Sequence, residues 1–156
     1  MLSFRDLMAA TGYFLFRWSR LELSLSESIL KGEASIGRTA DNGAPSFPSV
    51  TGSFPDRLKR WRAVMQAKAD PDLIEAIAQQ AEKVRVFRNT LVHGLAGGNS
   101  APRNGEEPHL RCIVGGWERP NGEIRKIGVS ELERYSEAAD ACARAFDHPH
   151  AFNFRL

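Results

Sequence analysis

Apolar side chains recur at helical spacing near the start of the chain, and this pattern constrains the fold more than any other feature of the sequence. The residues of this stripe, each three, four or seven positions from the next, are Leu7, Phe14, Trp18, Leu21, Leu25 and Ile29. Side chains at these intervals share one face of a helix. We therefore expect a long amphipathic helix over residues 3–31, with Ser3 and Asp6 as its capping pair and Gly32 at its end.

Two further helices are expected in the middle of the chain. Residues 32–52 are rich in glycine, proline and small polar residues, which is typical of a long surface loop. A second helix begins near Pro55. Asp70 followed by Pro71 is a strong start signal for a third helix over residues 71–93, and Gly94 is expected just beyond its end.

The rest of the chain predicts a hairpin followed by one more helix. Residues 95–109 are expected to be a loop, and segments 110–117 and 124–129 flank Asn121-Gly122, a pair that favours a tight hairpin turn. Ser130 and Glu133 form a capping box for a last helix, which ends before the tail 149–156. The pattern predicts one mainly α domain over residues 1–156, an antiparallel bundle of four to five helices with a small β-hairpin inserted before the last helix.

Composition excludes several classes of protein. The 156 residues suit a single domain, and 42% hydrophobic with 26% charged residues is ordinary for a folded protein. A net charge of +2 carries no polybasic signal. Cys112 and Cys142 have no CxxC partner, and His109, His148 and His150 match no zinc spacing, so we expect neither a metal nor another cofactor. No membrane span or signal peptide is recognisable, and a cytoplasmic location is expected.

The segment with the clearest chemistry is residues 88–94, with the sequence RNTLVHG. At about 100° per residue, Asn89 and His93 lie roughly 40° apart on one helix face. Arg88 lies about 140° from His93, but its long side chain can reach across the helix surface. The helix end favours a protonated imidazole and a nearby guanidinium opposes it, and the sequence leaves open which effect is larger. The three side chains are expected to meet in one pocket.

This segment resembles the signature of the HEPN superfamily (higher eukaryotes and prokaryotes nucleotide-binding). In that signature an arginine, usually followed by a polar residue, is separated by four to six residues from a histidine near a helix end. Residues 18–22 of the first helix resemble the family more loosely. The same spacing also occurs from Arg103 to His109 and from Arg144 to His150, but the first segment lies in a loop rich in glycine and proline and the second crosses Pro149. Only the segment ending at His93 combines a helix, a polar neighbour and a stop.

The resemblance implies a metal-independent endoribonuclease, of prokaryotic toxin or antiphage-defence type, with RNA as its substrate and an antitoxin protein as a possible partner. In such enzymes the RNA 2′-hydroxyl attacks the adjacent phosphate and leaves a 2′,3′-cyclic phosphate. Arg88 would stabilise the phosphoryl charge, His93 would move a proton, and Asn89 would orient His93 or the phosphate. The family's usual arrangement implies a homodimer with two facing motifs. The alternative is a non-catalytic nucleotide-binding or protein-assembly domain.

The remaining candidate residues have both functional and structural interpretations. Glu22, at the edge of the apolar stripe, either contacts Arg88 or Arg85 or is an ordinary exposed carboxylate. Arg85 either extends the phosphate-binding surface or is a surface charge. Trp117, near the expected hairpin turn, could contact RNA or a second subunit. For the motif itself, the structural interpretation is a helix end at which Arg88 pairs with a carboxylate.

Overall fold

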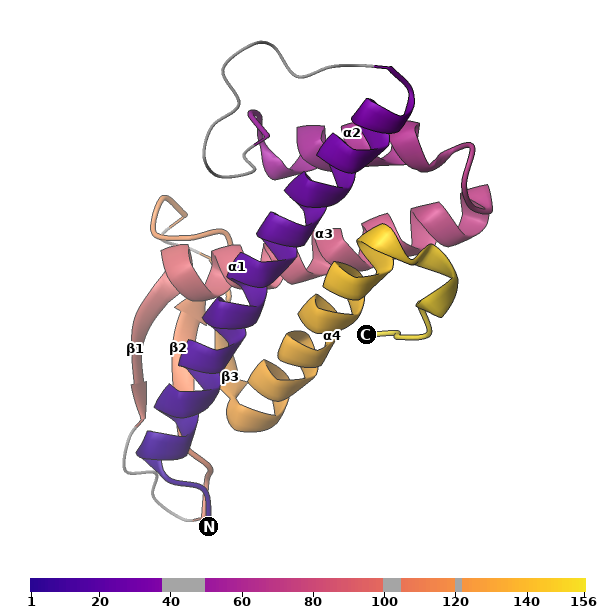
Figure 1. Ribbon diagram of the computed structural model, residues 1–156. Coiled ribbons are helices and arrows are strands. Elements are labelled where there is room, and N and C mark those ends of the chain that lie inside the picture. Colours follow the sequence, from indigo (N-terminus) through magenta and orange to yellow (C-terminus); the bar gives the residue numbers. More distant parts are fainter. Residues whose placement is uncertain (38–49, 100–104, 120–121) are drawn as a thin grey trace.

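The computed structural model describes residues 1–37, 50–99, 105–119 and 122–156 (Figure 1). In chain order the elements are α1 (Phe4–Ser35), α2 (Phe54–Met65), α3 (Pro71–Gly94), β1 (Leu95–Asn99), β2 (His109–Ile113), β3 (Ile124–Gly128), α4 (Val129–Asp147) and the 3-10 turn η1 (Pro149–Ala151). The mainly α fold with β structure inserted before the last helix is confirmed.

Helices α1 and α4 lie side by side and run in the same direction (Figure 1). Arg17 pairs with Asp140, and Lys31, further along α1, pairs with Asp147, further along α4. The antiparallel arrangement expected of the bundle is therefore wrong for this pair. The physical reason is the sheet, because β3 leads directly into α4 beside the beginning of α1 and so sets the direction of the last helix.

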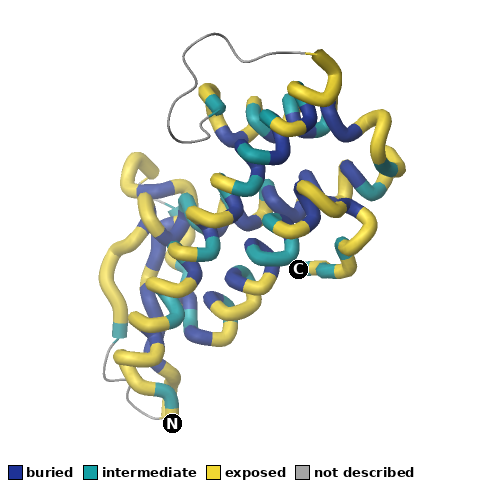
Figure 2. Tube along the Cα trace, in the orientation of Figure 1, coloured by how far each residue is buried: buried dark blue, intermediate teal, exposed yellow. Residues whose placement is uncertain are grey.

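The core forms where the inward faces of the helices meet (Figure 2). All six residues of the expected α1 stripe are buried, with exposed fractions of 5% or less. The Phe14 ring meets Phe87 of α3 edge to face at 5.1 Å, and Phe87 stacks on Tyr135 of α4 at 3.8 Å. Burial of one such ring contributes about 1.5–3 kcal/mol to stability. These contacts hold the C-terminal half of α3 between α1 and α4.

Helix α1 continues past Gly32 to Ser35, so the expected end at Gly32 is wrong. Gly32 is buried, and a Cβ atom there would lie 2.7 Å from the Cβ of Val64 in α2. The glycine therefore serves close packing between two helices rather than a helix stop, a use that local sequence does not reveal.

The expected helix starts have mixed outcomes. Ser3 and Asp6 form a capping box at α1, and the Asp70 side chain accepts hydrogen bonds from the first turn of α3, as expected. The capping box expected at Ser130 is wrong, because α4 begins at Val129 and its N-cap, Gly128, makes no side-chain cap bond. The preceding strand β3 already positions this helix start.

The sheet has three antiparallel strands in the order β1-β2-β3, one more than the expected hairpin. The additional strand is β1, so the expected loop over residues 95–109 is wrong at its start. Strand β1 is mostly exposed (Figure 2), and its sequence has two glycines and no alternation of apolar and polar residues. Residues 114–117 lie beyond the end of β2, whereas they were expected in the strand. Pro120 and Asn121 of the expected turn lie outside the described residues.

Gly94 is the last residue of α3 rather than the residue beyond it, and it sets the distance between the helix and the sheet. A Cβ atom at Gly94 would lie 2.3 Å from the carbonyl oxygen of Ile113 in β2. Only glycine allows this approach without a backbone shift. The end of α3 therefore lies directly against the sheet.

Both cysteines are buried free thiols, as expected. None of the described helices combines the length and apolar character needed to cross a bilayer.

Candidate functional site

The motif residues lie in the last two turns of α3, where the helix meets the sheet. The Nη1 atom of Arg88 donates to Oδ1 of Asn89 at 3.2 Å and lies 3.4 Å from Nε2 of His93. Arg88 and Asn89 are half-buried, and His93 is exposed. The structure thus brings together the three side chains that the sequence placed on neighbouring parts of one helix end.

The guanidinium of Arg88 carries a half-buried charge without a counterion. No carboxylate lies within 4.0 Å of it among the described residues, and its Nε atom is buried with no hydrogen-bond partner there. The group lies 6.0 Å from the ring centre of Trp18, at the outer limit of a cation–π contact. A buried N–H without a partner costs about 1–3 kcal/mol. The position of Arg88 is therefore explained poorly by stability alone.

The expected contact of Glu22 with Arg88 or Arg85 is wrong. Glu22 accepts from Arg57 of α2 at 2.7 Å, because α2 packs beside this part of α1. Arg85 pairs instead with Glu82, one turn earlier in α3, and this hydrogen-bonded pair raises the pKa of Arg85. Neither Glu22 nor Glu82 therefore neutralises Arg88.

A groove of about 750 Å³ opens beside the motif. Its first wall comes from α3 and includes Arg85, Asn89 and His93. Arg88 does not line the groove, so the expected meeting of all three side chains in one pocket is wrong for Arg88, which instead contacts the lining residues Asn89 and His93. The groove is large enough for part of a nucleotide chain.

The second wall is the segment from Val114 to Arg119, which follows β2. Gly115 and Gly116 have φ angles of +89° and +82°, a left-handed conformation that side chains other than glycine rarely adopt. This turn brings Gly116 against the backbone of His93, where an added Cβ would lie 3.5 Å from the His93 carbonyl oxygen. This wall falls in a segment expected to be strand, although two adjacent glycines before Trp117 are a visible signal of an unusual turn.

Two arginines and one carboxylate line the groove. Arg119 lies across Gly115 and forms no ion pair within the described part of the chain. Besides Arg119, the lining contains Arg85 and His93, and its one carboxylate is that of Glu118. Because Arg85 is paired with Glu82, the cations that favour an anionic ligand here are Arg119 and the neighbouring Arg88, which have no ion pair among the described residues.

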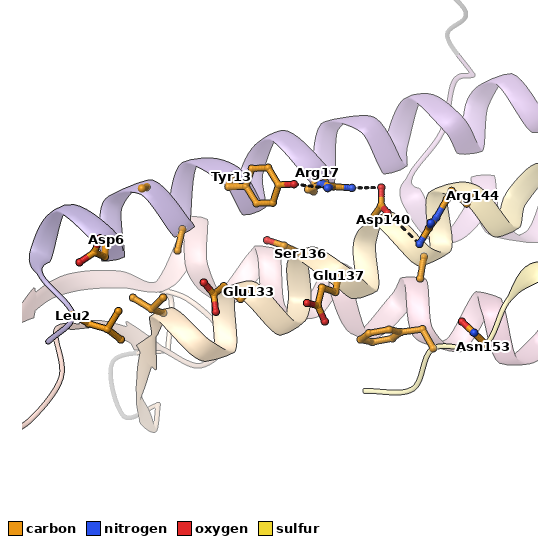
Figure 3. A pocket seen from close by; sticks show the side chains of 15 residues that line it. Leu2, Asp6, Tyr13, Arg17, Glu133, Ser136, Glu137, Asp140, Arg144 and Asn153 are labelled. Carbon is orange, nitrogen blue, oxygen red and sulfur yellow. Dashed lines mark hydrogen bonds and ion pairs between the residues drawn. The ribbon is translucent and has the colours of Figure 1, made fainter.

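A larger hollow of about 1000 Å³ lies between α1 and α4 (Figure 3). Arg17 there donates to the hydroxyl of Tyr13, which raises the pKa of Arg17, and it also pairs with Asp140. Asp140 in turn accepts from Arg144 at 3.2 Å. The lining also holds the carboxylates of Asp6, Glu133 and Glu137, but it contains no histidine or cysteine. The hollow therefore lacks the imidazole that the smaller groove has.

No three His, Cys, Asp or Glu side chains come together as a metal site within the described ranges.

Comparison of the chain with models of protein families, with curated proteins and with solved structures produced no match.

Proposed function

We propose that the protein is a HEPN-like, metal-independent endoribonuclease that binds an RNA phosphodiester at Arg88, Asn89 and His93. The observation that carries the proposal is the half-buried guanidinium of Arg88, which has no carboxylate partner in the described residues and reaches His93 at 3.4 Å. A phosphate oxygen would supply the missing counterion, and a planar guanidinium is well suited to bind it.

The contact between the two side chains also supports the proposed chemistry. A guanidinium can only donate hydrogen bonds, so Arg88 donates to Nε2 of His93 in the tautomer that carries no proton on that nitrogen. When Arg88 turns from this nitrogen to the phosphate, the freed lone pair can take the proton of an RNA 2′-hydroxyl. The 2′-oxygen then attacks phosphorus, the bond to the 5′-oxygen breaks, and Arg88 stabilises the charge that develops on the phosphoryl oxygens.

The leaving 5′-oxygen needs a proton from the opposite side of the phosphorus, and one imidazole cannot easily serve both sides. A second copy of the chain would supply a protonated His93 there, so we propose a homodimer with one composite cleft. Val86, before the motif, and Val92, within it, are exposed on the last turns of α3. Exposed apolar side chains beside the site suit a contact with a second copy.

The proposal is tested by incubating the purified protein with single-stranded RNA in the presence of EDTA. Cleavage to products with a 2′,3′-cyclic phosphate is expected, and it should be lost in Arg88→Ala and His93→Ala. His150→Ala is the matched control, because His150 is an exposed histidine in η1, outside the groove. A folded wild-type protein that cleaves no RNA in a broad panel would instead support the non-catalytic nucleotide-binding or assembly domain.

The composite cleft is tested by co-expressing wild-type and His93→Ala chains in varied proportion. If both imidazoles of a dimer are needed, activity falls with the square of the wild-type fraction, because only wild-type homodimers are complete. A linear decrease would show that each subunit acts alone.

The biological setting follows from the same resemblance. We propose a role as a prokaryotic toxin or antiphage-defence component in the cytoplasm, where an antitoxin protein would restrain it. The positive groove is the surface that such a protein would have to cover.

A further inference from the structure

We propose that Trp117 is a stacking platform for an unpaired base beside the scissile phosphate, so that the substrate is single-stranded RNA. This inference rests on the proposed ribonuclease function and adds to it the substrate class and the residue that selects it.

Trp117 differs from the other two tryptophans in its exposure. Trp18 and Trp61 are 5% and 0% exposed and belong to the core, whereas Trp117 is 63% exposed. An indole ring left in water forgoes about 1.5–3 kcal/mol that burial would contribute. Large exposed aromatic side chains that line a groove are typical of binding sites.

The indole ring is also held in place. Its Nε1 atom donates to the carbonyl oxygen of Leu95, at the start of β1, at 3.1 Å. The backbone before it is fixed by the two left-handed glycines and by a hydrogen bond from Gly116 N to the Ile113 carbonyl at 3.0 Å. The only polar group of the side chain is therefore occupied, and the ring face is what remains for a ligand. A ring face stacks on any base and reads no hydrogen-bond pattern.

The position of the ring matches the proposed chemistry. Gly116, the neighbour of Trp117, would place a Cβ atom 3.7 Å from the Cβ of His93, and both Trp117 and His93 line the same groove. Arg119 lies two residues further along the same wall without an ion pair in the described ranges. A base on Trp117 would thus leave its own backbone phosphates near His93 and Arg119.

This surface suits RNA better than a second copy of the chain. A second copy packed directly against this wall would bring another Arg119 guanidinium to it, whereas a nucleic acid held between the two motifs supplies negative charge together with flat apolar faces. Bases within a duplex are already stacked on their neighbours and cannot open onto a side chain without unpairing. The platform therefore selects single strands.

The test uses the His93→Ala protein, which retains Trp117 and Arg88 but cannot move the proton, and a short single-stranded RNA in which each base in turn is removed. Base stacking on an aromatic side chain corresponds to a loss of about 5- to 150-fold in affinity. One abasic position is expected to show this loss. Adding Trp117→Ala should weaken binding of intact RNA by a similar factor and abolish the effect of that abasic position.

Two further variants make the result specific. Trp117→Phe keeps an aromatic face, so it should retain most of the affinity and the abasic effect even if the alanine variant is poorly folded. Phe16→Ala removes an aromatic ring of similar exposure on α1 and should change neither.

The possible failures are distinguishable. If wild-type protein cleaves RNA but no abasic position matters, the stacking inference is wrong and the ribonuclease stands. If Trp117→Ala abolishes dimer formation in sedimentation while the abasic effect is absent, Trp117 is a subunit contact. If RNA is neither bound nor cleaved, the proposed function itself fails.

Discussion

Replacing Arg88 by methionine should abolish RNA cleavage while leaving the protein as stable as before, or more stable. The expectation comes from the surroundings of the guanidinium, which is half-buried and has no carboxylate partner among the described residues. Methionine has a similar length and flexibility, so it can fill the same space beside Trp18 without bringing a charge.

The magnitude follows from the contacts that would be lost and gained. The hydrogen bond to Asn89 at 3.2 Å, the contact with His93 at 3.4 Å and the Trp18 ring at 6.0 Å are all near the limits for such interactions, and together they contribute about 1 kcal/mol. Removing the buried, unpartnered Nε–H returns about 1–3 kcal/mol. The free energy of unfolding should therefore rise by about 0–2 kcal/mol, or up to about 6 °C in Tm.

Arg60→Met is the matched control. The Arg60 guanidinium donates to both carboxylate oxygens of Glu33 at 2.9 Å, and Glu33 is largely buried. Its loss should cost about 1–2 kcal/mol, because Glu33 keeps its charge without a partner. Urea unfolding followed by circular dichroism measures both variants, alongside the RNA cleavage assay. If Arg88→Met destabilises the protein as much as Arg60→Met, Arg88 is a structural residue and the reasoning is refuted.

Three further predictions concern the scaffold. Gly94→Ala should destabilise the protein by about 1–3 kcal/mol in urea unfolding, because its Cβ would collide with the Ile113 carbonyl; an unchanged midpoint would contradict the close approach. Hydrogen bonds from the capping serines lower the pKa of Asp6 and Asp56 from 3.8, so their stabilisation is present above pH 3.8 and is lost as pH falls through the lower folded-state pKa. The urea midpoint of the wild-type protein should fall on acidification below pH 4, and the fall should be smaller in the double variant Asp6→Asn, Asp56→Asn. Burial raises the pKa of Cys142 to about 12, so its thiol should react with Ellman's reagent only after unfolding; rapid labelling of the native protein would show an open core.

The helical part of the fold could be predicted because its signals are local. The stripe on α1 and the Asp70-Pro71 start each depend on residues within one or two turns of one another. The end of α1 could not be predicted, because the glycine at position 32 is required by close packing against Val64 of another helix and not by a helix end. The direction of α4 could not be predicted either, because it depends on the position at which β3 ends and α4 begins, beside the start of α1.

The candidate site was predictable only in part. The meeting of Asn89 and His93 on one face follows from helix geometry alone. The partner of Glu22 could not be predicted from helix geometry, because the pairing with Arg57 rather than Arg88 depends on the packing of α2 beside α1. The Trp117 indole donates a hydrogen bond to β1, an exposed strand whose sequence has no alternating pattern from which a strand could be predicted.

The two other segments with the same spacing show what distinguishes a candidate site from its sequence pattern. Arg103, the first residue of one of these segments, lies outside the described residues. His109, the last residue of the same segment, is buried in β2, where its Nδ1 atom lies 3.1 Å from the carbonyl oxygen of Glu107. Arg144 is mostly exposed and pairs with Asp140 one turn earlier. A neutralised, solvated arginine has no need of a ligand, whereas Arg88 is half-buried and lacks a counterion in the described chain. This electrostatic difference arises from tertiary packing. The sequence of residues 88–94 can therefore place the reacting groups on the helix, but it cannot show that the guanidinium of Arg88 lacks a counterion among the described residues.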